Sequence, residues 1–171
     1  GKLFYADYYV MELEVLSNAK IDKTIVIDYP MTINLNGKTL SATSALSATP
    51  VFRILSDVTV TGSGKVDGRG GESCYAFIVG NSTTEGNLTI ENGTFYGSVT
   101  AASVTKGTLT VNGGNFAATE YNGAHEFTLN CIDANYTAGN AKIVVNGGTF
   151  YKFNPANNAA EGAGTSFVTE K

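Results

Sequence analysis

One short motif recurs along the chain and limits the folds that it can adopt. Residues 88–95 read LTIENGTF, residues 109–116 read LTVNGGNF and residues 143–150 read IVVNGGTF. Two looser copies precede them, MTINLNGKTL at 31–40 and VTVTGSGKV at 58–66. The last apolar residue before each glycine turn marks a copy, and successive markers are separated by 25, 30, 21 and 34 residues (Leu35, Val60, Ile90, Val111 and Val145). Repeats of this length are typical of a solenoid whose coils stack on one another, with insertions in the longer coils.

The motif itself predicts a strand followed by a tight turn. Apolar residues alternate with Thr or Asn, which is the period of a β-strand rather than of a helix. Asn-Gly or Gly-Gly then turns the chain, because these residues accept positive φ at little cost. A second apolar strand is expected before most copies (residues 24–27, 51–55, 75–79 and 127–132). Stacked coils with two or three short strands each describe a parallel β-helix.

The bounds of the β-helix and of its two flanking segments follow from where the repeat begins and ends. We expect an N-terminal cap at 1–23, the β-helix at 24–153, and a C-terminal tail at 154–171 that packs on the last coil. Within the cap, Tyr9, Leu13 and Leu16 form an apolar stripe at helical spacing and predict a helix over 6–19, with an extra strand as the alternative. Insertions are expected at 41–50, 65–73 and 117–126.

Composition and charge argue against several classes of partner. Only 15% of residues are charged and the net charge is −4, so the clustered cations that nucleic acid requires are not expected. No apolar stretch approaches the ~18 residues of a membrane span. Cys74 and Cys131 are expected two coils apart and too distant for a disulfide, so we predict two free, buried thiols. We expect no cofactor and no metal, since Cys-x-x-Cys spacing is missing and His125 is the single histidine.

The rungs MTINLNGKTL, VTVTGSGKV and NGGTF resemble pectin-lyase-like β-helices over nearly the whole chain. The resemblance implies an all-β, single-stranded right-handed parallel β-helix of about five rungs. Residues 130–168, with GGTF, FNP, and AEGAGT followed by Phe, resemble the end of uncharacterised β-helical surface or phage structural proteins of gut Bacteroides-type bacteria. That resemblance implies an extracellular, cell-surface or virion location.

Residues expected for catalysis on this scaffold are scattered. The resemblance implies that lyases and hydrolases of this superfamily need acidic residues at matched positions of adjacent rungs, and the Asn-Thr-Asp, Asp-Asp and Gly-His-Gly motifs of the polygalacturonase-like hydrolases are absent. The nearest approach to a reactive cluster is Lys65, Asp67 and Arg69, which we interpret as part of a solvated, glycine-rich loop. His125 is expected on the surface, and Asp133 is expected to be a partly buried structural acid. Asn112 and Asn146 are candidates for an internal ladder of stacked amides.

Two tyrosines suggest a binding surface. If Phe95 and Phe150 face the core, strand alternation sends Tyr96 and Tyr151 outward on the same side, with the coil that carries Ala117 between them. With Tyr121 in the nearby insertion, they form a candidate platform for stacking on sugar rings of a polysaccharide or host-surface glycan.

Three hypotheses stay open. The first is a non-catalytic surface or phage-appendage module for adhesion or glycan binding, and the second is a polysaccharide lyase or glycoside hydrolase whose site escapes motif analysis. The third is a purely structural segment of a trimeric fibre. The oligomeric state is left as monomer or homotrimer.

Overall fold

A computed structural model describes residues 11–119, 127–158, 161–162 and 164–168, and its strands form three parallel sheets. The first sheet has the order β1-β4-β7-β10-β13-β16 (Met11–Glu14, Met31–Asn34, Asp57–Thr61, Gly86–Ile90, Gly107–Val111, Ala141–Val145). The second has the order β2-β5-β8-β11-β14-β17 (Ala19–Ile21, Thr39–Ala42, Lys65–Asp67, Thr94–Gly97, Asn115–Ala118, Thr149–Phe150). The third has the order β3-β6-β9-β12-β15 (Ile25–Ile27, Pro50–Ile54, Tyr75–Val79, Thr100–Val104, Leu129–Cys131).

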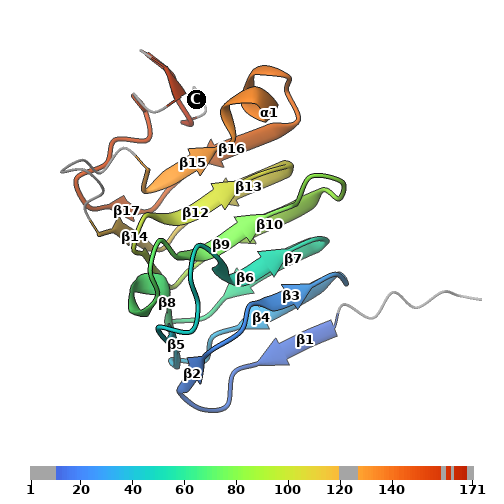
Figure 1. The fold of residues 1–171 in the computed structure, drawn as a ribbon, viewed down its shortest axis with the longest axis vertical. Helices are drawn as coiled ribbons and strands as arrows, with labels where there is room; N and C mark the ends of the chain where they lie inside the picture. The colour runs from blue at the N-terminus through green and yellow to red at the C-terminus, as the bar shows by residue number, and fades with distance from the viewer. Residues whose placement is uncertain (1–10, 120–126, 159–160, 163, 169–171) are drawn as a thin grey trace, which may run out of the picture.

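The chain visits the three sheets in a fixed cycle, as Figure 1 shows. Each passage through the first, second and third sheets is called a coil below. Every recorded strand pair is parallel, and a strand pairs with the strand three places along the chain. The architecture is therefore all-β and consistent with a parallel β-helix, as the repeat predicts.

Copies of the motif occupy equivalent positions in successive coils. Leu88 pairs with Leu109, which pairs with Ile143 in the first sheet. In the second sheet Phe95 pairs with Phe116, which pairs with Phe150. The in-phase stacking predicted from the repeat is thus confirmed in these coils.

Glycine closes the corner between the first and second sheets. Gly93, Gly114 and Gly148 have φ values of 118°, 98° and 108°, which side chains rarely tolerate. A Cβ on Gly93 would also lie 2.6 Å from the ring of Phe95. The corner therefore needs glycine both for its backbone angle and for space.

A column of phenylalanine rings fills the core along the coil axis. The rings of Phe52, Phe77, Phe95, Phe116, Phe150 and Phe153 follow one another with centroid separations of 5.7, 5.3, 5.3, 5.1 and 5.9 Å. These separations are in the range of favourable aromatic pairs. From β4 to β16, the inward-facing aliphatic residues of the first sheet are buried in the same core. Stacking of neighbours thus supplies the core that no single coil contains.

The helix predicted over residues 6–19 is wrong in its described part. Met11–Glu14 forms β1, which pairs with β4, and Ala19–Ile21 forms β2, which pairs with β5. The open ladder of β4 offers a row of backbone partners to an adjacent extended segment, and this outweighs the spacing of Leu13 and Leu16, which remain exposed. Residues 1–10, including Tyr9, lie outside the described part of the chain.

All three expected insertions are shorter than predicted, and in the first of them Ser41 and Ala42 belong to β5. Lys65–Asp67 is strand β8, followed by the short 3-10 helix Gly68–Gly70. Ala117 and Ala118 belong to β14. In each place the ladder continues past the last recognisable motif residue, because backbone pairing does not depend on which side chain follows.

The C-terminal end closes over the last coil. A short helix, α1 (Asp133–Thr137), precedes β16, and the tail returns so that Phe167 is buried and packs edge-on against Tyr136. The backbone N–H of Val145 donates to the carbonyl of Phe167 at 2.7 Å, and Val168 forms a parallel bridge with Val145.

Both cysteines are free and buried, as predicted. Cys131 in β15 pairs with Val104 in β12, which pairs with Val79 in β9, the strand that Cys74 precedes. The two thiols are therefore two strands apart in the third sheet. Among the described residues, no helix is both long and apolar enough to cross a membrane.

Candidate functional site

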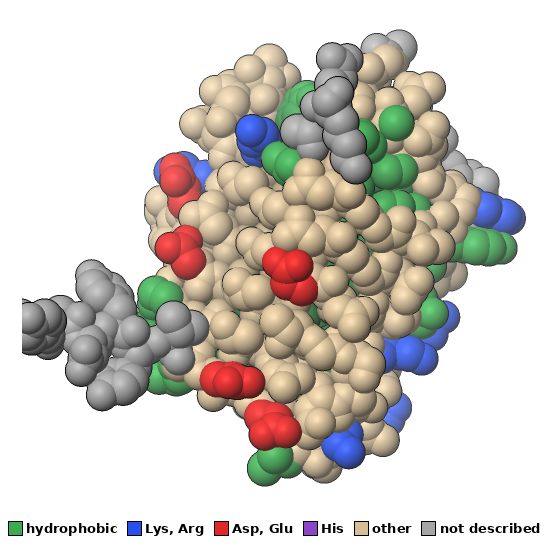
Figure 2. Space-filling model, turned by 180° about the vertical axis from the view of Figure 1, so that it is seen from behind, with side chains coloured by type: hydrophobic (Ala, Val, Ile, Leu, Met, Phe, Trp, Pro, Cys, Tyr) green, Lys and Arg blue, Asp and Glu red, His purple; other side chains and the backbone are tan. Residues whose placement is uncertain are grey.

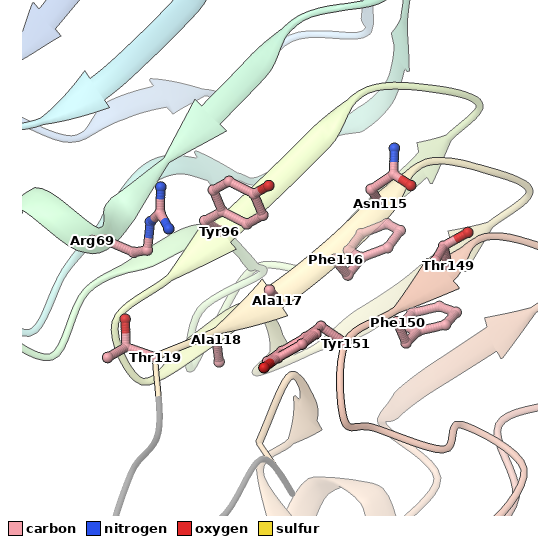
Figure 3. A pocket seen from close by; sticks show the side chains of 10 residues that line it. All are labelled: Arg69, Tyr96, Asn115, Phe116, Ala117, Ala118, Thr119, Thr149, Phe150 and Tyr151. Carbon is pink, nitrogen blue, oxygen red and sulfur yellow. The ribbon is translucent and has the colours of Figure 1, made fainter.

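A groove on the outer face of the second sheet gathers three of the six predicted site residues, Arg69, Tyr96 and Tyr151. Because Phe95, Phe116 and Phe150 point inward, the residues that follow them lie on the outer side: Tyr96 in β11, Ala117 in β14 and Tyr151 directly after β17. Tyr96 pairs with Ala117, and the N–H of Tyr151 donates to the carbonyl of Phe116 at 3.0 Å. In Figure 3 the two tyrosine rings flank Ala117 along the direction in which the coils stack. The groove has a volume of about 400 Å³.

Arg69 lies at one end of this groove and contacts the ring of Tyr96. Its guanidinium carbon lies 4.1 Å from the ring centroid of Tyr96, and the ammonium nitrogen of Lys65 lies 5.4 Å from the same centroid. Cations at such distances are attracted by the ring quadrupole. Both cations come from the coil before Tyr96, and the Tyr96 side chain is half-buried.

Asp67 fixes the position of Arg69. The Nε and Nη2 atoms of Arg69 donate to the two carboxylate oxygens of Asp67 at 2.9 and 2.7 Å, and the Arg69 backbone N–H donates to Asp67 Oδ1 at 3.0 Å. This two-pronged pairing restricts the planar guanidinium to one orientation. Asp67 itself lies in β8, paired with Tyr96 on one side and with Ser41 on the other. The interpretation of these three residues as a solvated loop is therefore wrong for Lys65 and Asp67.

The electrostatics keep the pair charged. Partial burial of Asp67 acts to raise its pKa, but the hydrogen bonds from Arg69 and the charges of Arg69 and Lys65 outweigh it and lower the pKa. The hydrogen bond to Asp67 is the largest influence on Arg69 and raises the pKa of its guanidinium. Neither group is suited to exchange a proton near neutral pH.

The opposite end of the groove is more open. Tyr151 is 57% exposed, and the ammonium of Lys152 lies 5.5 Å from its ring centroid. Asn115 and Thr149 line one rim, and Thr119 lines the groove beyond Ala118. Among the described residues that line the groove, none is acidic. The site offers two aromatic rings, hydroxyl and amide groups, and excess positive charge.

The structure brings together the predicted tyrosine platform and the predicted charged cluster, which the sequence pattern did not link. The groove is lined by Tyr96, Tyr151 and Arg69. Lys65 contacts the ring of Tyr96 and Asp67 accepts hydrogen bonds from Arg69, but neither residue lines the groove. Tyr121 and His125 lie outside the described residues. Asp133 was predicted to be partly buried, and this is wrong, because it occupies the exposed first turn of α1.

The predicted amide ladder exists on the exterior rather than in the core. Asn146 Nδ2 donates to Asn112 Oδ1 at 2.9 Å, and Asn112 Nδ2 donates to Glu91 Oε1 at 2.9 Å. All three residues are exposed. Each follows the buried aliphatic residue at the end of its strand, and alternation therefore directs its side chain outward.

Glu161 is a partly buried acid that the sequence pattern did not single out. Its Oε1 accepts the backbone N–H of Cys131 at 2.6 Å, while Oε2 is buried and has no hydrogen-bond partner among the described residues. Burial is the main cause that raises the pKa of Glu161, and the charge of Asp133 adds to it. Burial likewise raises the pKa of the Cys131 thiol far above its ordinary range. The only signal in the sequence is a single acid among the small residues of the tail.

Charged side chains are sparse over the rest of the surface. Most of the face seen in Figure 2 is backbone and side chains that are neither apolar nor charged, with a few acidic side chains among them. Within the described ranges, no three His, Cys, Asp or Glu side chains gather as they would around a metal ion. Comparison of the chain with known protein families, with curated proteins and with solved structures finds no match.

Proposed function

We propose that this chain is a non-catalytic β-helix module that binds a glycan in the groove between Tyr96 and Tyr151. The observation that carries the proposal is the convergence of two tyrosine rings, with hydrogen-bonding rims, in one groove. Aromatic faces stack on the apolar faces of sugar rings, while amides and hydroxyls bond the sugar hydroxyls. The Asp67–Arg69 pair supports binding because it positions Tyr96 before the ligand arrives.

Titration with a broad panel of polysaccharides and oligosaccharides, followed by tyrosine fluorescence, tests this proposal. We expect saturable binding by at least one glycan, weakened about tenfold or more in Tyr96→Ala and in Tyr151→Ala, since each loses one stacking surface. Tyr29→Ala is the matched control, because Tyr29 is an exposed tyrosine that does not line the groove. A complete lack of response across the panel would contradict the proposal.

A polysaccharide lyase is the second candidate, and the meeting of Lys65, Asp67 and Arg69 beside the groove favours it. A lyase needs a base that removes a proton next to a carboxylate of the sugar. The raised pKa of Arg69 and the lowered pKa of Asp67 make both poor bases, so binding is the better supported function. The absorbance of unsaturated products from uronate-containing polysaccharides distinguishes the two: a rate abolished in Lys65→Met would establish the lyase.

The proposal also covers the finer features of the fold and its setting. We propose a right-handed coil, because parallel crossover connections within a sheet are right-handed in nearly all cases. The five motif copies support about five rungs of a pectin-lyase-like β-helix. The FNP and AEGAGT segments resemble the end of bacterial surface and phage structural proteins, and this resemblance supports a place on a bacterial cell surface or phage appendage. The trimeric-fibre alternative is less well supported, because it needs an apolar lateral face, whereas the exposed large apolar side chains of the described residues lie in the first coil or after β15.

A further inference from the structure

The first coil leaves one end of the core uncovered. β1, β2 and β3 are the outermost strands of their three sheets, and each pairs along one edge only with another described strand. Leu13 is 40% exposed, although Ile33 and Val60, which continue the same inward-facing column, are fully buried. Ile25, which pairs with the buried Phe52, is half-buried for the same reason. Unpaired backbone and uncovered apolar side chains therefore meet on one surface, formed by β1, β2 and β3.

The opposite end of the stack is closed, as Figure 1 shows. The C-terminal tail lies over the last coil, where Phe167 is 3% exposed and Val168 forms a bridge with Val145. A second copy therefore cannot place its first coil on this end without displacing the tail. The ends left for contact between two copies are the two first coils. Two identical surfaces that meet in this way are related by a twofold axis, and they form a closed dimer rather than a filament.

The twofold axis restricts which strands meet. It runs perpendicular to the direction in which the coils stack, so it sets the strands of one copy antiparallel to those of the other. In a coil of three strands, such an axis places one strand opposite its own copy and exchanges the other two. Three arrangements are therefore possible, in which β1, β2 or β3 faces itself.

The outward-facing charges of the first coil differ between its strands. Glu12 and Glu14 of β1 point outward, because Leu13 between them points into the coil. Lys20, at the centre of β2, points outward for the same reason. All three charged residues are exposed, and none of them forms an ion pair with another described residue. β3 carries no charge, and its outward-facing Val26 is 51% exposed.

These charges select one of the three arrangements. If β1 faced itself, the acidic pair of one copy would lie against the acidic pair of the other, and like charges on facing strands are destabilising. If β2 faced itself, the two copies of Lys20 would approach each other. If β3 faces itself, β1 of each copy lies opposite β2 of the other, so that acidic and basic side chains meet twice. The uncharged β3 then contacts itself through apolar side chains.

We infer that the first coil is a dimerisation surface, on which a second copy of this chain binds with β1 opposite β2 and β3 opposite β3. The contact completes three sheets at once and covers the uncovered end of the core. This surface is separate from the groove, whose lining begins at Arg69, so the dimer and the proposed glycan binding stand or fall independently.

Analytical ultracentrifugation of the whole chain over a wide range of concentrations tests the inference by charge exchange. The wild type is expected to show a reversible monomer–dimer equilibrium. Lys20→Glu makes both strands acidic, and the double change Glu12→Lys with Glu14→Lys makes both basic. Each variant alone is expected to dimerise about tenfold more weakly or worse, because like charges now face each other twice. An equal mixture of the two variants should dimerise as the wild type does, because both contacts again join opposite charges.

Lys142→Glu is the matched control. Lys142 is an exposed lysine of β16, at the other end of the first sheet, and its replacement changes the net charge as Lys20→Glu does. This variant is expected to dimerise as the wild type does. Equal melting temperatures of the dilute variants show that the coils remain folded.

Several results would overturn the inference. A wild type that is monomeric at every concentration would do so, and slow amide exchange in β1 of that monomer would identify residues 1–10 as the cover of the coil end. A trimer would favour the fibre instead. A dimer that persists in Lys20→Glu, or a mixture of the two variants that stays monomeric, would show that the copies do not meet with β1 opposite β2.

Discussion

The middle coils and the C-terminal closing segment both cover the apolar surface of the coil before them, but they do so in different ways. From β7 to β14, each coil repeats the burial pattern of the one before it, and paired positions carry similar apolar residues. From Leu129 onward, the chain inserts α1, returns as a tail and buries groups of unlike chemistry. Two side-chain oxygens there, Asn130 Oδ1 and Glu161 Oε2, are buried without hydrogen-bond partners among the described residues.

This difference shows what periodicity can and cannot provide. A stacked coil finds in its neighbour the same apolar surface that it presents, so core burial is matched automatically. The last coil has no such neighbour, and its surface must be covered by a segment of different sequence. Phe167 covers that surface through apolar contact. Glu161 covers it by accepting a hydrogen bond from β15, which leaves its carboxyl group partly desolvated.

Replacing one phenylalanine in each region gives the largest expected effects. Phe95→Ala opens the ring column between Phe77 and Phe116 and is expected to lower the free energy of unfolding by about 3–5 kcal/mol. Phe167→Ala is expected to cost less, about 2 kcal/mol, because the tail can detach while the coils stay folded. Chemical denaturation of both variants measures the difference. Equal losses would mean that the tail and the coils unfold as one unit.

Glu161 gives the closing segment a pH dependence opposite in sign to that of Asp67 in the middle coils, whose pKa is lowered. Since the pKa of Glu161 is raised in the folded state, its favourable contribution is full below its ordinary pKa of 4.5 and is lost as the pH rises through the folded value. Stability is thus expected to increase as the pH falls from neutral towards that window. Glu161→Gln should remove this increase and raise the melting temperature at neutral pH, as thermal melts between pH 4.5 and 7.5 would show. An identical pH profile in the two proteins would contradict the assignment.

The smallest effect is expected at the groove, on the surface of the middle coils. Asp67→Asn breaks an ion pair whose arginine side chain is 47% exposed, so the free energy of unfolding should change by less than about 1 kcal/mol. The same change frees Arg69 and should increase the mobility of the Tyr96 ring, measurable by NMR relaxation. A large loss of stability would instead show that Asp67 supports the fold of the coil rather than the position of the tyrosine.

The predictable part of the molecule is the part that obeys a period of two. Alternation from Phe95 and Phe150 sufficed to place Tyr96 and Tyr151 outside on the same side, and the repeat phase placed Cys74 and Cys131 two strands apart. At the N-terminal end a strand was predicted only as the alternative to a helix, because the apolar spacing there also fits a helix, and the ladder of β4 decides between the two.

The candidate site was predicted only in part for a different reason. Aligning GKVD at 64–67 with GTFY at 93–96 pairs Asp67 with Tyr96, so one more residue of alignment would have joined the tyrosine platform and the charged cluster. Nothing in the pattern shows that Arg69 turns back onto Asp67 and Tyr96, because that depends on the short 3-10 helix at Gly68–Gly70. The contact of Glu161 with Cys131 spans 30 residues and has no periodic signal.

Cross-linking across the first sheet tests the stacked, parallel register most directly. Thr89 pairs with Thr110 on the adjacent strand, whereas Thr59 lies one strand further away. Cysteines at 89 and 110 should form a disulfide on mild oxidation, because paired positions fall within the ~4.4–6.8 Å separation of disulfide-linked Cα atoms. Cysteines at 59 and 110, roughly 10 Å apart, should not. Peptide mapping by mass spectrometry that finds the 89–110 link alone is the predicted result. Efficient formation of the 59–110 link, with none between 89 and 110, would contradict the stacked coils and the groove built on them.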